Sequence, residues 1–118
     1  MCASWLLSPC SSSGLSGSPF SPVYSAAKHG VVGLTKAAAV EYARAGVRVN
    51  AICPGTVDTP MFRASMPTEL IDRLVRTNPV GRLADAREIA DIALWLCEDA
   101  TGYLTGQAIT VDGGATHP

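Results

Sequence analysis

The stretch Ala45–Gly55, AGVRVNAICPG, decides the fold class of this 118-residue chain. Gly46 is well placed to end a preceding helix, because glycine readily takes the left-handed conformation found at helix C-termini. Val47–Cys53 is a run rich in valine and isoleucine with the length of a strand, and Pro54–Gly55 ends it. A helix, a tight turn, a strand and a glycine-containing loop in this order predict an α/β protein with a parallel sheet.

An alanine-rich run from Pro22 to about Arg44 is predicted to form the helix that precedes this strand. Ser21 can cap the helix, and Pro22 fits its first turn. Gly30 and Gly33 lie inside the run, although an interior glycine costs about 1 kcal/mol relative to alanine. Two explanations are equally good: the helix simply tolerates both glycines, or another helix approaches it closely there.

The chain beyond Gly55 carries one decisive local signal. Asp85 is followed three residues later by Glu88, and this pattern of a capping box predicts a helix that runs to about Glu98. The other expectations are an irregular stretch, a short amphipathic helix and a second strand, at Thr56–Pro67, Pro67–Thr77 and Ala108–Val111.

Composition excludes several classes of function. The hydrophobic fraction of 47% and the charged fraction of 16% indicate a globular chain of one domain at most. A formal charge of -1 gives no reason to expect nucleic acid or an anionic membrane as a partner, and no apolar run approaches the roughly 18 residues of a spanning helix. Neither histidine and none of the cysteines has the spacing of a metal site or a disulfide framework, which favours a reducing cytoplasm. These residues are His29, His117, Cys2, Cys10, Cys53 and Cys97.

Candidate chemistry begins with Tyr24 and Lys28, which stand four residues apart and therefore share one face of the predicted helix. A phenol beside an ammonium can release its proton more easily than free tyrosine, whose pKa is about 10. Tyr24 is thus a candidate general acid/base. Taken alone, however, the pair is explained better by packing and solvation at a helix surface.

Four motifs in order reverse that preference. They are Ser11, Tyr24-x-x-x-Lys28, Asn50–Gly55 followed by Thr59, and Tyr103–Gln107 followed by Val111–Gly114. In this order and spacing they resemble the short-chain dehydrogenase/reductases, especially the branch with the 3-oxoacyl-carrier-protein reductases. The resemblance implies an α/β fold: the C-terminal half of a doubly wound, three-layer Rossmann-type sheet, with strands 5-6-7 and their flanking helices.

The resemblance also implies an NAD(P)-dependent oxidoreductase that moves a hydride between nicotinamide and a small-molecule carbonyl or secondary alcohol. Tyr24 would give or take the proton of the substrate oxygen. Lys28 would lower the pKa of Tyr24 and hold the nicotinamide ribose hydroxyls. Ser11, which stands thirteen residues before Tyr24 as in the family, would fix the substrate oxygen.

In the same family pattern, the residues after the strand would hold NAD or NADP. Pro54 and Gly55 would line the nicotinamide face, while the Val57 backbone and the Thr59 hydroxyl would bind the carboxamide. This placement agrees with the general rule that ligands of open α/β sheets bind at the carboxyl ends of the strands. Family members pair into dimers or tetramers, so a homo-oligomer is expected.

The chain departs from the family in what precedes Ser11. The sequence has no glycine-rich turn for the pyrophosphate and no Asn-Asn-Ala-Gly segment. We therefore expect residues 1–118 to form a single partial domain: 1–10 an atypical remnant of the strand before the serine, 11–118 the family's C-terminal half, and about 56–80 its substrate loop. The alternative to an enzyme is a catalytically incompetent fragment that acts as an oligomerisation or interaction module.

The expected sheet would expose an unpaired edge next to residues 1–10, and exposed edges of parallel sheets promote association. We predict that the isolated chain folds poorly or associates, as measured by light scattering and thermal unfolding. A sharp, cooperative transition from a monodisperse monomer would contradict this expectation.

Overall fold

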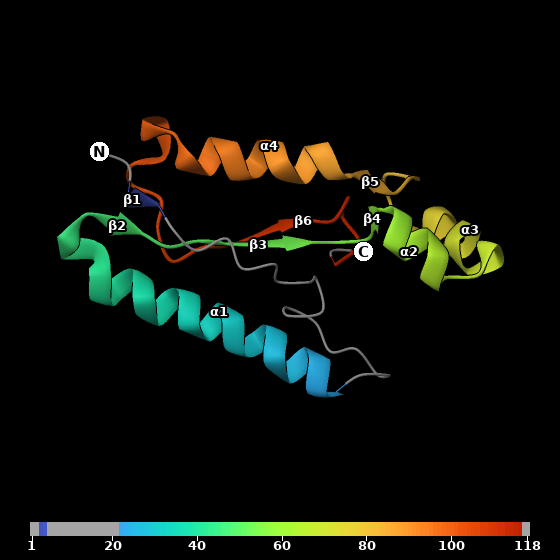
Figure 1. Cartoon of the computed structure of the whole chain (residues 1–118), viewed down its shortest axis with the longest axis horizontal. Coiled ribbons are helices and arrows are strands. Elements are labelled where there is room, and N and C mark those ends of the chain that lie inside the picture. Colours follow the sequence, from blue (N-terminus) through green and yellow to red (C-terminus); the bar gives the residue numbers. More distant parts are fainter. Residues whose placement is uncertain (1–2, 5–21, 117–118) are drawn as a thin grey trace.

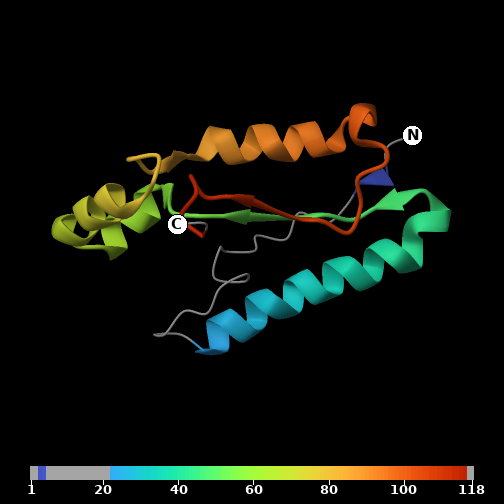
Figure 2. The ribbon, with the colours of Figure 1, turned by 180° about the vertical axis from the view of Figure 1, so that it is seen from behind.

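In the computed structural model, which describes residues 3–4 and 22–116, a layer of strands lies between two helices (Figure 1). α1 (Pro22–Tyr42) lies on one side of the strands and α4 (Ala86–Cys97) on the other. The view from behind shows the same order of layers (Figure 2). The shorter helical elements are η2 (Ala43–Ala45), α2 (Pro60–Ser65), α3 (Thr68–Thr77) and η3 (Asp99–Thr101).

Each of the three strand pairs in the described part of the chain is parallel. The pairs are β1 (Ala3–Ser4) with β2 (Val47–Arg48), β3 (Ala51–Pro54) with β6 (Ala108–Val111), and β4 (Val57–Asp58) with β5 (Ala84–Asp85). The parallel pairing and the helices on both sides of the strands confirm the predicted α/β class.

Both ends of α1 lie where the sequence predicts them. The helix begins at Pro22, and after the single turn η2 the chain reverses at Gly46, whose φ of 77° lies in the left-handed region. The Gly46 amide donates to the Ala43 carbonyl oxygen at 3.0 Å, so it satisfies a carbonyl at the helix end. The glycine C-cap is thereby confirmed.

The predicted strand Val47–Cys53 is wrong in one respect, because it is split into β2 and β3 at Val49–Asn50. At the split the hydrogen bonds go to the turn before β6: the Asn50 amide group donates to the Leu104 carbonyl oxygen at 2.9 Å and accepts from the Gln107 amide at 3.1 Å. A side chain that replaces ladder bonds in this way is invisible to strand periodicity.

The expectation that Thr56–Pro67 is irregular is also wrong, since this stretch contains β4 and α2. The Thr59 hydroxyl accepts from the Phe62 amide at 3.2 Å, and Pro60 occupies the first turn of α2. A Thr-Pro pair of this kind is a local signal for a helix start. The expected helices at Pro67–Thr77 and Asp85–Glu98 are confirmed as α3 and α4, and the capping box of Asp85 and Glu88 forms.

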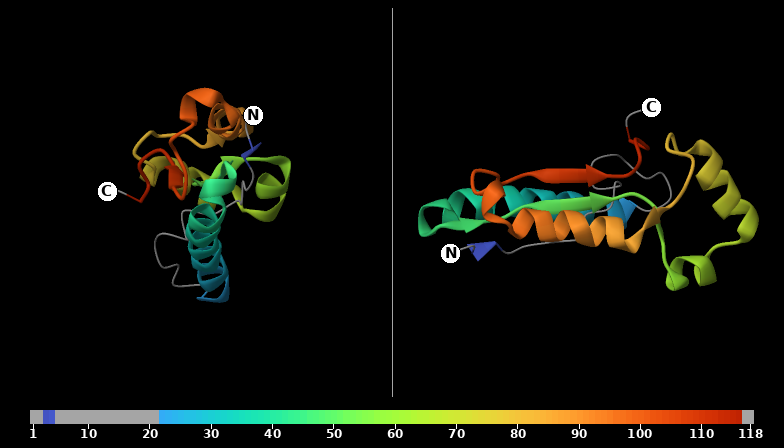
Figure 3. Two further views of the ribbon diagram at one scale, coloured as in Figure 1. Left: turned by 90° about the vertical axis from the view of Figure 1, so that its left-hand side faces the viewer. Right: turned by 90° about the horizontal axis from the view of Figure 1, so that it is seen from above.

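The core is thin and lies where α1 crosses β3. Val32, Ala51 and Cys53 are buried there and Ala108 packs against them. The outer face of α1 stays open: Leu34 is 59% exposed, and a Cβ added at Gly30 or Gly33 would have no described neighbour within 4 Å. Figure 3 shows α1 projecting away from the strands, with no other described helix against its outer side.

No close helix-to-helix contact therefore explains the two glycines of α1 within the described part of this chain. None of the described helices combines the length and the apolar character needed to cross a membrane.

Substituting two glycines of contrasting surroundings tests this packing. Gly30→Ala should stabilise the chain by up to about 1 kcal/mol, because it removes a flexible residue from an open helix position. Gly55→Ala should destabilise it by about 1–3 kcal/mol, because the new Cβ would lie 2.8 Å from Asp112 Cβ. Urea unfolding followed by circular dichroism measures both changes, and equal effects of the two substitutions would contradict the described packing.

Candidate functional site

The candidate site lies at the carboxyl end of β3, where the loop residues after the strand and the beginning of α1 point to the same end of the molecule. Figures 1 and 2 both show the Pro22 end of α1 and the Pro54 end of β3 on that side. α1 slants away from the strands toward its Pro22 end, and the loop after β3 leaves the strands at the same end of the molecule. This is the edge at which parallel α/β sheets bind ligands.

Tyr24 and Lys28 are brought together on α1, as predicted from their spacing. The Lys28 ammonium nitrogen lies 5.3 Å from the centre of the Tyr24 ring, within the range of a cation–π contact. The Tyr24 side chain is 45% exposed and therefore accessible. In the next turn, His29 Nδ1 and the carbonyl oxygen of the buried Ser25 lie 2.8 Å apart. This hydrogen bond fixes the imidazole ring of His29 against the helix backbone.

The second group of predicted residues follows β3 directly. Pro54 ends the strand, and the Gly55 amide donates to the Val111 carbonyl oxygen at 3.0 Å. Val57 belongs to β4, opposite Ala84 in the register. All of these positions are half-buried, so the backbone is accessible but fixed by its neighbours.

The donors in this region fit a nicotinamide ring and its ribose. The Thr59 hydroxyl accepts from the Phe62 amide and keeps its own hydrogen to donate to a carbonyl oxygen such as that of a carboxamide. The Lys28 ammonium carries three donors, which suit ribose hydroxyls. Of the predicted residues, only Ser11 lies outside the described part of the chain, and its place beside Tyr24 stays a prediction.

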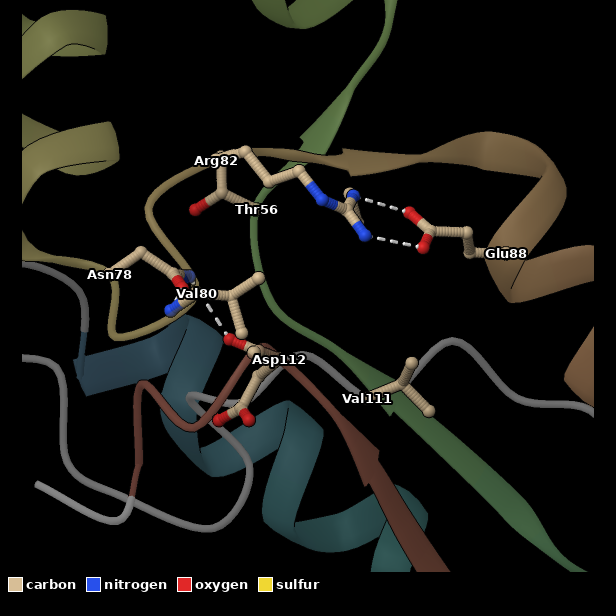
Figure 4. A pocket seen from close by; sticks show the side chains of 9 residues that line it. Thr56, Asn78, Val80, Arg82, Glu88, Val111 and Asp112 are labelled. Atoms are coloured by element: carbon tan, nitrogen blue, oxygen red, sulfur yellow. Dashed lines mark hydrogen bonds and ion pairs between the residues drawn. The ribbon is translucent and has the colours of Figure 1, made fainter.

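Beside this loop lies a cavity of about 120 Å³ that sequence reasoning did not foresee (Figure 4). The Asn78 side-chain amide donates to the Asp112 carbonyl oxygen at 3.1 Å, and the Arg82 guanidinium forms two bonds of 2.7 Å to the Glu88 carboxylate. The run from Asn78 through Pro79 to Gly81 signals a turn, but nothing in it indicates that the turn meets Asp112. The lining residues are Thr56, Asn78, Val80, Arg82, Ala84, Glu88, Val111, Asp112 and Gly113.

Two exposed ion pairs shape the charge around the loop. Hydrogen bonds from Arg82, and then one from the Asp85 amide, lower the pKa of Glu88 to about 2. The hydrogen bond from Arg63 lowers the pKa of Asp58 in the same way. Within the described ranges no three histidine, cysteine or acidic side chains gather as metal ligands.

The chain matches known oxidoreductases over nearly its whole length. Residues 6–116 match the family described as Enoyl-(Acyl carrier protein) reductase. A 2,5-dichloro-2,5-cyclohexadiene-1,4-diol dehydrogenase of Sphingobium indicum is 41% identical over 113 residues, a match that covers 94% of this chain and 45% of that enzyme.

Solved structures give the same result. A 3-oxoacyl-[acyl-carrier protein] reductase from Brucella melitensis is 36% identical with a TM-score of 0.88, and the match covers 97% of this chain and 42% of that one. ElxO with NADP bound is 33% identical with a TM-score of 0.83, over 92% of this chain and 44% of that one. The chain thus spans less than half the length of these relatives.

The ion pair of Glu88 should give the stability of the chain a specific pH dependence. A folded-state pKa of about 2, against an ordinary value of 4.5, means that the carboxylate stabilises the fold above pH 4.5 and loses this effect as the pH falls through about 2. The stability difference between the native chain and Glu88→Gln should therefore be present at neutral pH and shrink across that range. Urea midpoints at several pH values measure it, with Glu41→Gln on α1 as the control, and a difference independent of pH would be the contrary result.

Proposed function

Because this chain belongs to the short-chain dehydrogenase/reductase family, we propose that it carries the proton-transfer side of an NAD(P)-dependent oxidoreductase acting on a carbonyl or secondary alcohol. The observation that carries the proposal is the contact of Lys28 with the Tyr24 ring at 5.3 Å, on an accessible helix turn at the carboxyl end of β3. Tyr24 then serves as the general acid/base.

The chemistry divides between cofactor and protein. When bound, the nicotinamide supplies or accepts the hydride. In the direction of reduction, the Tyr24 hydroxyl donates its proton to the carbonyl oxygen as that oxygen gains negative charge, and in oxidation it takes the proton back. The Lys28 ammonium lies beside the ring whose hydroxyl makes this transfer. Ser11 would hold the same substrate oxygen by a hydrogen bond.

The loop after β3 would orient the ring. Pro54 and Gly55 would lie along the nicotinamide face, the Val57 backbone and the Thr59 hydroxyl would bind its carboxamide, and Lys28 would bind the ribose. Support comes from the donor chemistry of these groups and from the solved relative that has NADP bound.

A second candidate function is a non-catalytic module that binds a copy of itself. It is favoured by the open outer face of α1, where Val23 and Val40 are each 81% exposed. An apolar face of this kind is unusual on a surface that stays in water. Under either function we propose a homo-oligomer, a dimer or tetramer, and a reducing cytoplasmic location.

Removing one hydroxyl tests the proposed acid/base. Tyr24→Phe should lower turnover of NADPH with a 3-oxoacyl ester by at least about 100-fold, because general acid catalysis contributes this much or more. The loss of NADPH absorbance measures the rate, and circular dichroism checks that the helix persists. The matched control is Tyr42→Phe at the far end of α1, which is 48% exposed and should leave turnover unchanged. Full activity in Tyr24→Phe would remove Tyr24 from the mechanism.

Cofactor binding separates the two candidate functions. NADPH or NADH at millimolar concentration should quench tryptophan fluorescence or raise the unfolding temperature if the chain holds a nicotinamide. A chain that responds to neither cofactor, but sediments as a dimer or larger species, is the module.

A further inference from the structure

We infer that Asp112 is a positioning residue for the segment Gly55–Thr59. This segment begins a loop that runs from Gly55 to Asn78, and both ends of the loop contact Asp112 at a point that we call the neck of the loop. The assignment of that segment to nicotinamide binding rests on the proposed function. The inference that Asp112 holds it in place rests on the contacts at the neck alone.

Both ends of the loop meet at Asp112. At the first end, the Gly55 amide donates to the Val111 carbonyl oxygen, and a Cβ at Gly55 would lie 2.8 Å from Asp112 Cβ and 2.9 Å from Asp112 Cα. The Gly55 backbone is thus packed directly against Asp112. At the other end, after α2 and α3, the Asn78 side chain donates to the Asp112 carbonyl oxygen at 3.1 Å (Figure 4).

The Asp112 side chain stabilises the turn that follows β6, and this turn fixes the Asp112 backbone that contacts Gly55 and Asn78. The residue is 7% exposed, and its carboxylate accepts from the Gly114 amide at 2.9 Å, the Thr116 amide at 2.9 Å and the Thr116 hydroxyl at 2.7 Å. Gly113 and Gly114 have φ values of 64° and 85°, so the chain turns sharply under the carboxylate. Only a group that accepts on both oxygens matches this set of donors.

Gly113 ties the turn to the loop a second time. A Cβ at Gly113 would lie 2.6 Å from the Asn78 side-chain oxygen, so the turn and the loop end are in close contact. The same Asn78 oxygen accepts from the Val80 amide at 2.9 Å, which fixes the side chain that reaches Asp112. The Asn78 side chain is therefore oriented by the backbone of the turn directly after it.

The opposite side of the segment is held by β5. The Ala84 amide donates to the Thr56 carbonyl oxygen at 3.1 Å, and β4 pairs with β5 in parallel register. The segment thus lies between a strand on one side and the Asp112 turn on the other. If the turn loosens, Gly55 loses the residue packed against it while β4 keeps its pairing with β5, so the change should be local to the loop and its neck.

Hydrogen–deuterium exchange on the full chain tests this assignment. Asp112→Asn places an amide NH₂ against donors, so one oxygen can no longer accept from them. We expect about tenfold faster exchange of the backbone amides from Gly55 to Thr59, with β3 amides unchanged. Asp91→Asn, an exposed aspartate on α4, is the matched control and should change neither set.

A milder pair of variants keeps the test valid if Asp112→Asn fails to fold. Thr116→Val removes only the hydroxyl bond to Asp112, and Thr116→Ser restores it. Faster exchange at Gly55–Thr59 in Thr116→Val, with protection regained in Thr116→Ser, supports the positioning role. Exchange that rises equally in β3 and α4, or that does not rise at all, overturns it.

NADPH binding by the same variants keeps this inference distinct from the proposed function. If the native chain binds NADPH, Asp112→Asn should weaken binding about tenfold, and unchanged affinity with a loosened loop overturns the link to the cofactor. If the native chain binds no nicotinamide, the proposed function fails, and the exchange pattern still decides whether Asp112 holds the loop.

Discussion

The parallel pairing of β3 with β6 is the interaction on which the rest of the structure depends. It runs in register from Ala51 opposite Ala108 to Pro54 opposite Val111. Parallel strands cannot be joined by a tight turn, so everything between them must cross over the sheet, and α2, α3 and α4 lie in that crossover. Because the strands end together, Gly55 and Asp112 emerge side by side, and the loop after β3 starts at a point fixed by the end of β6.

This common end of the two strands fixes only one part of the candidate site. The Pro54–Thr59 segment is held on one side by β5 and on the other by the Asp112 turn. The beginning of α1 is different, because the helix leaves the strands there and Tyr24 is half exposed. The relative placement of the two segments thus depends on how α1 packs on the strands.

The small core lies on the inner side of α1 only. Most buried apolar side chains of the described part lie on β3, at Val49 just before it and on the inner face of α1, while the outer face of that helix carries exposed apolar residues. The chain matches relatives more than twice its length.

Local signals in the sequence were sufficient for the elements whose hydrogen bonds close within a few residues. Gly46 ends α1, the Asp85 box begins α4, and the strand character of Ala108–Val111 is confirmed in β6. The pairing of Tyr24 with Lys28 followed from helical spacing alone. The family resemblance came from motif order, and the comparisons bear it out.

What only the tertiary structure decided are the contacts between residues far apart in the chain. The split of β2 from β3 depends on Asn50 bonding to Leu104 and Gln107, and the neck of the loop depends on Asn78 reaching Asp112. Neither partner is indicated by propensity or periodicity, because a side chain that bonds to backbone dozens of residues away leaves no local pattern. Sequence by itself determined α1, α3, α4, β6 and the proximity of Tyr24 to Lys28. The fold decided what holds the loop after β3, since that is set by which strand ends meet.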